Sequence, residues 1–366
     1  MFKGTTRALR FGKGWKLGAP RVRELELELE GSGGTFVATL LIPEGATGPL
    51  PGWVTLHGIT RPGRKHPTMV RFVKALAASG AAVLVPEIPE WREMLLAPRE
   101  AADTLRAAVL ALAQREETAS DRLGVMGFSF GGPQALMAGM DPALAPHLKV
   151  VASFGGYCDM ERTLRFLFFG EHEWKGKRYQ ADPDPYGRWV VGGNYLSKAE
   201  GFEGTEEVAE ALLSLAKDAG DIQVASWDAL HDARKAELEE TLPPSQRRLF
   251  RVFAPAHGAE IPRETADKVV PAMTRAALKD SPLFDIGPQL HRLEVPVRLI
   301  HGRQDRLIPF TETLRLAASF PPGSDLRVFL TGLFSHSQRD SGKMSVRALG
   351  EQLRFLRLMS VVLGTL

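Results

Sequence analysis

Hydrophobic and polar positions alternate strictly over residues 24–30, which read Glu-Leu-Glu-Leu-Glu-Leu-Glu. In a strand this alternation places the three leucines on one face and the four glutamates on the other. A face this charged suits a strand at the edge of a sheet. A glycine-rich turn at 31–34 follows, and residues 36–42 are apolar again. The pattern therefore predicts a β-hairpin.

Short apolar runs and helical periodicities then alternate along the chain. The expected strands lie at about 53–56, 81–85, 123–126, 149–154, 295–300 and 326–330. The expected helices lie at about 68–78, 98–115, 131–140, 310–319 and 343–363. Alternation with apolar strands predicts an α/β protein: a doubly wound, mostly parallel sheet with helices on both faces.

The alternation stops between residues 158 and 292, which show helical patterns and no clear strand. A connection of this length is far longer than a crossover between two strands needs. We therefore predict a mainly helical cap domain at 158–292. It would be inserted into an α/β core formed by residues 1–157 and 293–366.

Composition fits this picture, since 44% of the 366 residues are hydrophobic and 24% are charged. These values are typical of globular proteins and exclude a disordered, coiled-coil or collagenous chain. The single cysteine, Cys158, excludes an intrachain disulfide. Together with an N-terminus that lacks an apolar leader, this favours a cytoplasmic location. No run of 18 apolar residues is present, so we expect no membrane span.

Charge is unevenly distributed along the chain. The net charge is +3, yet residues 1–23 hold seven lysines and arginines and no acid, which leaves −4 for the rest. This basic segment could contact an anionic partner, or it could be a solvated tail that lies on the body. We expect no nucleic-acid partner from so small a net charge. Homo-oligomeric assembly stays open.

Candidate chemistry begins at residues 127–131, Gly-Phe-Ser-Phe-Gly. In a G-x-S-x-G motif between a strand and a helix, the serine hydroxyl projects from a strained turn, and the glycines avoid collisions there. An apolar strand precedes this motif and a helix of small residues follows it. The context predicts that Ser129 is a nucleophile rather than an ordinary turn serine.

A serine hydroxyl is a poor nucleophile without a base and an orienting acid. His336 is the candidate base, in the loop after the last expected strand, and Asp305 is the candidate acid, just past the preceding strand. Both would lie beyond the carboxyl ends of strands, where ligands gather in α/β sheets. Helix capping is the alternative role for Asp305.

These residues resemble the α/β-hydrolase superfamily, whose chain order of nucleophile, acid and base is that of Ser129, Asp305 and His336. Within this superfamily, the sequence is most similar to esterase and dienelactone-hydrolase-like members with long helical lids. The resemblance covers about 30–157 and 293–366 and rests on four features: GFSFGG at 127–132, the His57-Gly58 turn, HGRQDRLIP at 301–309, and His336.

The resemblance implies a role for each of the three residues. Ser129 would attack an acyl carbonyl, and His336 would take its proton and pass it to the leaving group. Asp305 would orient His336 and stabilise its charged form. Asp159 is the alternative acid, because some family members place the acid after that earlier strand.

The resemblance also implies an oxyanion hole made of backbone N–H groups. Phe130, the residue after the nucleophile, would supply one donor. Ile59 would supply the second, with Thr60 as the next choice, although the HGGG form of some esterases is absent. His57 is expected to be structural.

The cap is rich in aromatic residues, and Phe166, Phe169 and Trp189 are our candidates for lining an acyl pocket. Packing within the cap is the alternative for each of them. Cys158 is a weaker candidate nucleophile than Ser129, because a lone cysteine is usually a small buried hydrophobe. The basic loop at 61–66 could attract an anionic substrate, or it could simply be solvated.

No metal-binding or nucleotide-binding motif is present, and we expect no metal and no cofactor. The sequence thus predicts a serine hydrolase that cleaves a small or medium carboxylic ester through an acyl-enzyme. Amide or peptide hydrolysis and acyl transfer on the same three residues are the alternatives. A further alternative is a non-catalytic ligand-binding protein of this fold. The presence of all three residues argues against it, because a binding protein does not need them.

Overall fold

The structure is a computed structural model that describes residues 2–19, 21–332 and 346–366. An eight-stranded sheet forms its centre, in the order β1-β2-β4-β3-β5-β6-β9-β10. Neighbouring strands from β4 to β10 run parallel, whereas β2 is antiparallel to both β1 and β4. The strands are β1 (Val22–Gly31), β2 (Gly34–Pro43), β3 (Leu50–Leu56), β4 (Ala82–Pro86), β5 (Thr118–Phe128), β6 (Leu148–Phe154), β9 (Val297–Gly302) and β10 (Leu326–Thr331).

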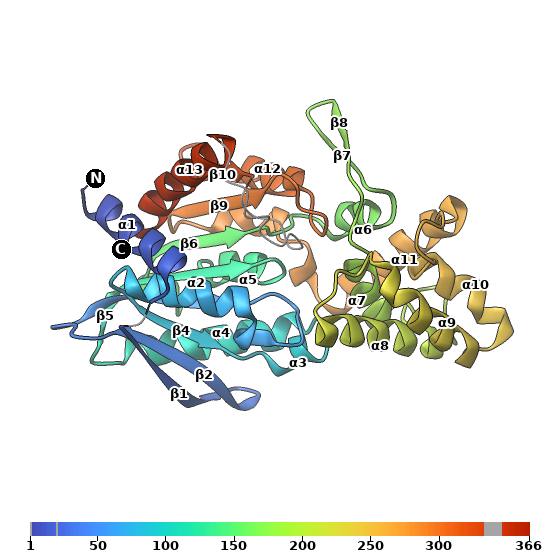
Figure 1. The fold of residues 1–366 in the computed structure, drawn as a ribbon, viewed down its shortest axis with the longest axis horizontal. Helices are drawn as coiled ribbons and strands as arrows, with labels where there is room; N and C mark the ends of the chain where they lie inside the picture. Colours follow the sequence, from blue (N-terminus) through green and yellow to red (C-terminus); the bar gives the residue numbers. More distant parts are fainter. Residues whose placement is uncertain (1, 20, 333–345) are drawn as a thin grey trace.

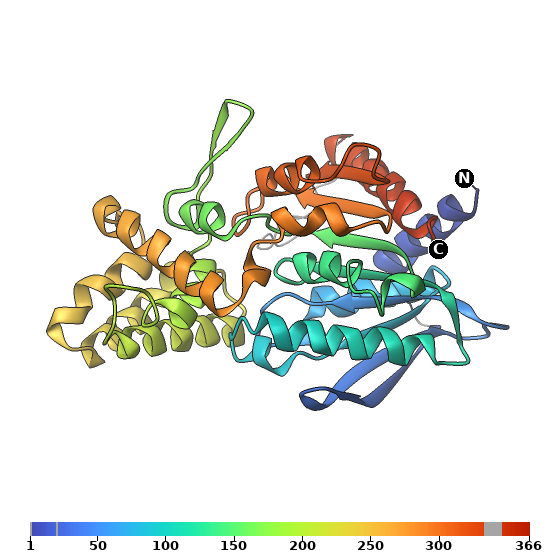
Figure 2. The ribbon, with the colours of Figure 1, turned by 180° about the vertical axis from the view of Figure 1, so that it is seen from behind.

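Two layers of helices cover the sheet, because its central strands are apolar on both faces. Trp53 of β3 packs in the core on one face, whereas Val54 and Leu56 pack in the core on the other. The first layer holds α1 (Phe2–Leu17), α2 (Pro67–Ala78) and α13 (Val346–Leu363). The second holds α4 (Pro98–Ala113), α5 (Gly131–Ala138) and α12 (Phe310–Ala318). Figures 1 and 2 show the two layers from opposite sides.

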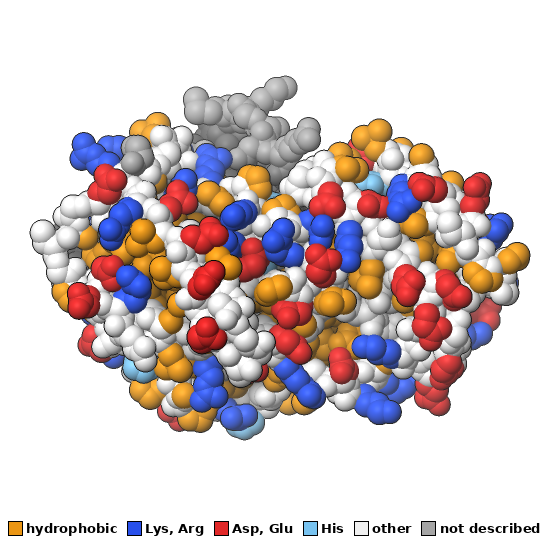
Figure 3. All heavy atoms as spheres, turned by 90° about the horizontal axis from the view of Figure 1, so that it is seen from below, with side chains coloured by type: hydrophobic (Ala, Val, Ile, Leu, Met, Phe, Trp, Pro, Cys, Tyr) orange, Lys and Arg blue, Asp and Glu red, His pale blue; other side chains and the backbone are white. Residues whose placement is uncertain are grey.

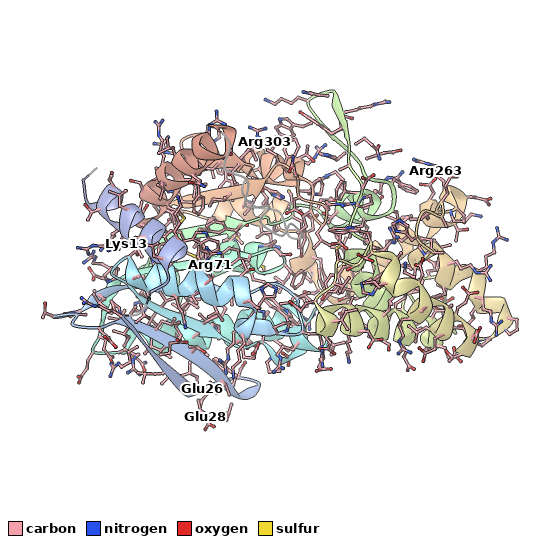
Figure 4. The ribbon with its side chains drawn as sticks, viewed as in Figure 1. Lys13, Glu26, Glu28, Arg71, Arg263 and Arg303 are labelled. Carbon is pink, nitrogen blue, oxygen red and sulfur yellow. The ribbon has the colours of Figure 1, made fainter. Side chains whose placement is uncertain are left out.

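The predicted hairpin is confirmed as β1 and β2, in which Leu25 pairs with Leu40. Strand β1 is the edge of the sheet. Its glutamates share the more exposed face, as the alternation predicts: Glu28 projects away from the body (Figure 4), and Glu26 lies 3.3 Å from the guanidinium of Arg64. The doubly wound α/β architecture is confirmed as well.

The N-terminal segment lies on the body, as predicted, but it is an ordered helix and not a solvated tail. Residues 2–17 form helix α1, which packs against α2 and α13. Ala8 and Phe11 are fully buried, and the Phe11 ring lies 5.2 Å from that of Phe72 and 6.0 Å from that of Phe355. The tail interpretation is wrong because Ala8, Phe11 and Trp15 form an apolar stripe at helical spacing among the basic residues.

The residues between β6 and β9 form most of a second body beyond one end of the sheet (Figure 1). We call residues 158–292 the insert. Its helices are α6 (Met160–Phe169), α7 (Pro185–Tyr195), α8 (Glu206–Ile222), α9 (Asp232–Thr241), α10 (Pro244–Phe253) and α11 (Arg263–Asp280). Short helical elements complete the chain: α3 (Pro89–Arg92), η1 (Gly63–Lys65), η2 (Ala145–His147), η3 (Ala229–His231), η4 (Pro282–Phe284) and η5 (Gly287–Arg292).

The expectation of no strand in the insert is wrong. Strands β7 (Glu171–Trp174) and β8 (Lys177–Gln180) pair in an antiparallel hairpin that projects from the body (Figures 1 and 2). Each strand has only four residues, and half of the eight are charged and exposed. Strands this short and polar leave little apolar periodicity in a sequence.

The surface carries both signs of charge. On the face in Figure 3, lysine and arginine side chains are interspersed with aspartate and glutamate, and small hydrophobic areas lie between them. Within the described part of the chain, no helix has the length and apolar character that crossing a bilayer requires.

Candidate active site

A cavity of about 1090 Å³ lies where the sheet meets the insert. Its core side includes the residues that end or follow β3, β5, β6 and β9, so four parallel strands present their carboxyl ends to it. Residues of α1 and α2 line it as well. Its other side is formed by α6, α7 and the segment from the end of α8 to η3. In an open α/β sheet, this is the edge at which ligands bind.

Ser129 lines this cavity at the turn between β5 and α5. Its φ is +54°, a left-handed conformation that costs a residue with a β-carbon about 1–3 kcal/mol. Two backbone hydrogen bonds hold the turn: Ser129 N–H to Phe154 O (2.8 Å) and Gly132 N–H to Ser129 O (2.9 Å). The predicted strand–turn–helix context of the serine is therefore present.

The motif glycines are required by close packing around the turn. A β-carbon on Gly127 would collide with the backbone of Gly131. A β-carbon on Gly131 would in turn lie 2.8 Å from the carbonyl oxygen of His57. Strand β5, helix α5 and the loop after β3 thus approach one another so closely that only hydrogen atoms fit at these positions.

Asp305 lines the same cavity and is buried. Its Oδ1 accepts the backbone N–H groups of Leu307 (2.9 Å) and Ile308 (3.0 Å), and its Oδ2 lies 3.5 Å from Nε2 of His301. The backbone bonds are local capping contacts, as the alternative role of Asp305 requires. They also fix the orientation of the carboxylate, which is what an orienting acid needs.

His336 lies outside the described residues, so its placement stays a prediction. Among the described histidines that line the cavity, His301 has hydrogen-bond partners for both of its ring nitrogens. Its Nε2 donates to Ile308 O (2.8 Å), and its Nδ1 is 2.6 Å from Oγ1 of Thr313. His66 also lines the cavity, and burial followed by the charge of His57 lowers the pKa of its imidazole.

Asp159, the alternative acid, begins helix α6. Its carboxylate accepts the backbone N–H of Arg162 (2.8 Å) and lies 3.3 Å from the guanidinium of the same residue. It is not among the residues that line the cavity. Its backbone N–H donates to the buried carboxylate of Glu312, which also accepts the N–H of Cys158. These contacts give Asp159 a local structural role.

The two predicted oxyanion donors lie on the cavity wall. Ile59 is in the loop after β3, and Phe130 immediately precedes α5. The ring of Phe130 is buried against Trp91 (5.5 Å between centroids) and Tyr157 (6.0 Å). Thr60, the next choice after Ile59, lines the cavity too.

The three aromatic residues chosen for the pocket lie outside its lining. Phe166 is fully buried against the ring of His172 (5.4 Å). Trp189 is fully buried and donates its indole N–H to Phe253 O (2.9 Å). Phe169 lies under the guanidinium of Arg263, 4.2 Å from its ring centroid. All three pack within the insert, which was the alternative interpretation.

The opposite faces of the same two helices line the cavity. Helix α6 contributes Met160, Thr163 and Leu167, and helix α7 contributes Tyr186, Gly187, Val190 and Val191. These positions recur at helical spacing, but all of them except Tyr186 have side chains that were less conspicuous in the sequence than the aromatics. The periodicity of α6 and α7 was the signal that could have found them.

Cys158 is buried beside this site, and burial raises the pKa of its thiol to about 12. A thiol of this kind stays protonated and is a poor nucleophile. Among the described residues, no group of three or more histidine, cysteine or acidic side chains is arranged to hold a metal ion.

No model of a known protein family matches this sequence, and no curated protein matches it. Several solved structures are similar in fold. A mutant of esterase Est22 aligns over 98% of this chain and 85% of its own, with a TM-score of 0.52 and 12% identity. A hypothetical protein from Pseudomonas aeruginosa aligns over 95% of both chains, with a TM-score of 0.50 and 16% identity.

An acylaminoacyl peptidase from Pyrococcus horikoshii aligns over 94% of this chain, with a TM-score of 0.51 and 10% identity. The chain spans only 41% of that protein's length. With these similarities, the strand order and the Ser129 turn define the class: the chain has the α/β-hydrolase fold.

Proposed function

We propose that this protein is a serine hydrolase that cleaves small or medium carboxylic esters. The observation that carries the proposal is the strained turn of Ser129, which lies on the wall of a cavity that a buried carboxylate, Asp305, also lines. Strain of 1–3 kcal/mol (approximately) is retained only where the surrounding structure enforces it, and it is concentrated at functional sites.

In the proposed reaction, the hydroxyl of Ser129 attacks the acyl carbonyl while His336 accepts its proton. The negative charge that develops on the carbonyl oxygen is stabilised by the backbone N–H groups of Ile59 and Phe130. His336 then protonates the leaving alcohol, and an acyl group remains on Ser129. A water molecule, activated by His336, releases the acid and regenerates the serine. Asp305 orients His336 throughout.

The cavity supports a substrate of moderate size. Its volume of about 1090 Å³ is slightly above the usual range of ligand pockets, roughly 300–1,000 Å³. The walls supplied by the insert include Met160, Leu167, Val190 and Val191. We assign residues 158–292 the role of a cap that shapes this pocket and shields the acyl-enzyme from water.

Steady-state kinetics on matched substrates tests the reaction class. The proposal predicts turnover of p-nitrophenyl esters and much slower turnover of the corresponding anilides. Faster cleavage of the anilides would instead assign amide or peptide hydrolysis to the same residues. Preferential transfer of the acyl group to an added alcohol or amine would assign acyl transfer.

A further inference from the structure

The loop that carries the proposed oxyanion donor Ile59 is held from the core by a buried carboxylate. Glu87 lies 3.1 Å from Nε2 of His57 and accepts the backbone N–H of Arg64 (3.3 Å). All three side chains are buried. The carboxylate of Glu87, directly after β4, therefore contacts the loop after β3 at two positions, His57 and Arg64.

The same loop is held from the insert by a tyrosine. The hydroxyl of Tyr186, on α7, lies 3.3 Å from the carbonyl oxygen of Ile59 and 2.8 Å from Sδ of Met94. A hydroxyl has one proton, and a carbonyl oxygen is a stronger acceptor than a thioether, so we assign the proton to the longer contact with Ile59. Burial raises the pKa of Tyr186, which keeps the hydroxyl protonated.

An arginine makes a second connection between the loop and the insert. Nε of Arg61 donates to Asp221 near the end of α8 (3.0 Å), and its Nη1 donates to Glu93 (2.7 Å). Glu93 also lies 2.8 Å from the ammonium group of Lys217 on α8. A β-carbon on Gly220 would lie 2.6 Å from Cγ of Arg61, so α8 packs closely on this side chain.

These contacts fix two successive peptide groups. Nδ1 of His57 donates to the carbonyl oxygen of Gly58 (2.7 Å), and Tyr186 donates to that of Ile59. In a trans peptide the C=O and N–H point in opposite directions. The bond to Gly58 therefore orients the N–H of Ile59, and the bond to Ile59 orients the N–H of Thr60.

We propose that Tyr186 is a positioning residue for the oxyanion hole, through which the insert sets the geometry of the catalytic loop. The inference rests on the proposed hydrolase function. The insert then does more than enclose the substrate: it fixes a backbone segment that lines the cavity next to Ser129. Without the Tyr186 hydroxyl, the peptide between Ile59 and Thr60 loses a bond that holds its orientation, and the loop that carries the N–H of Ile59 is held less firmly.

Tyr186→Phe tests this role, because it removes the hydroxyl and keeps the ring. We expect kcat to fall about tenfold or more, since weakening one oxyanion donor costs up to ~10²–10³-fold. KM should change little, because the donor acts mainly in the transition state. Tyr195→Phe is the matched control: this tyrosine lies on the same helix, and its hydroxyl donates to Asp280 (3.0 Å) instead of the loop.

A second readout separates positioning from a general loss of structure. Sulfur accepts weaker hydrogen bonds than oxygen, so thionoesters depend less on the oxyanion hole. The ratio of the oxygen-ester rate to the thionoester rate should therefore fall in Tyr186→Phe and stay at the wild-type value in Tyr195→Phe. If Tyr186→Phe does not fold, Asp221→Asn weakens the second connection at an exposed site, and it should lower the same ratio about twofold.

Two results would overturn the proposal in distinguishable ways. Wild-type kcat and an unchanged ratio in Tyr186→Phe, with the wild-type enzyme active, would remove the positioning role and leave the proposed function intact. An equal effect in Tyr195→Phe would have the same meaning. A wild-type protein that forms no acyl-enzyme with any ester would overturn the proposed function, and the positioning role with it.

Discussion

Gly58 passes directly beside Ser129: a β-carbon on Gly58 would lie 3.2 Å from the β-carbon of Ser129 and 3.5 Å from the carbonyl oxygen of Phe128. The loop after β3 and the turn after β5 are thus in contact beside the hydroxyl of the proposed nucleophile. Any side chain at Gly58 forces these two backbone segments apart by a few tenths of an ångström.

Gly58→Ala should therefore lower kcat about tenfold or more, because an ångström of misplacement in an active site costs on the order of 10²-fold. Steady-state kinetics on a p-nitrophenyl ester gives the value. Gly33→Ala, in a turn with nothing within 4 Å of the new β-carbon, is the matched control and should behave as wild type. Equal kcat in the two variants would mean that the loop after β3 takes no part in the reaction.

The two candidate acids differ in their surroundings, and this predicts different responses to the same change. Asp305→Asn keeps an oxygen for the N–H groups of Leu307 and Ile308 but removes the charge. We expect kcat to fall on the order of 10³-fold with little change in Tm. Asp159→Asn should be mild, since asparagine caps a helix as well as aspartate does. The reverse order of the two kcat values would place the acid at Asp159.

The identity of the base can be tested against His66, one of the described histidines that line the cavity. His336→Gln should reduce kcat on the order of 10³-fold, because Ser129 would lose its proton acceptor. His66→Gln should reduce it by less than about 10²-fold, the lower limit for losing a positioned acid or base. Rates of acyl-enzyme formation, measured for both variants by stopped flow, decide between them. A larger loss in His66→Gln would contradict the assignment of His336.

The face of α6 that lines the cavity predicts which changes alter ester preference. Leu167→Ala enlarges the pocket and should shift the preferred p-nitrophenyl ester toward longer acyl chains, at a stability cost of about 2–5 kcal/mol. Phe169→Leu, on the same helix but outside the lining, is the control and should keep the wild-type preference. If Phe169→Leu changed the preferred ester length and Leu167→Ala did not, Phe169 rather than Leu167 would line the pocket.

Most of the core could be predicted because its signals are local. The alternation at 24–30, the apolar strands and the Gly-Phe-Ser-Phe-Gly turn depend on neighbouring residues and on backbone sterics. The α1 stripe of Ala8, Phe11 and Trp15 was hidden by the basic residues between its members. The charged four-residue strands of the insert hairpin carried too little apolar pattern to be recognised.

Only those parts of the site could be predicted that a sequence motif or the order of residues along the chain indicates. Ser129 and Asp305 line one cavity, although they are 176 positions apart in the sequence. The bond between Tyr186 and Ile59 could not be predicted, because it depends on how α7 docks against the sheet rather than on any spacing. For the same reason, the sequence did not show that Phe166, Phe169 and Trp189 lie outside the cavity lining whereas Tyr186 belongs to it.

The central claim is that Ser129 is the nucleophile, and covalent labelling with a fluorophosphonate tests it most directly. The wild-type protein should be labelled once, and mass spectrometry of the digest should place the label on the peptide that contains Ser129. Ser129→Ala should take no label and lose on the order of 10³-fold or more in kcat while keeping the wild-type Tm. Unchanged labelling of the folded Ser129→Ala variant, or a label on another residue of the wild-type protein, would contradict the account.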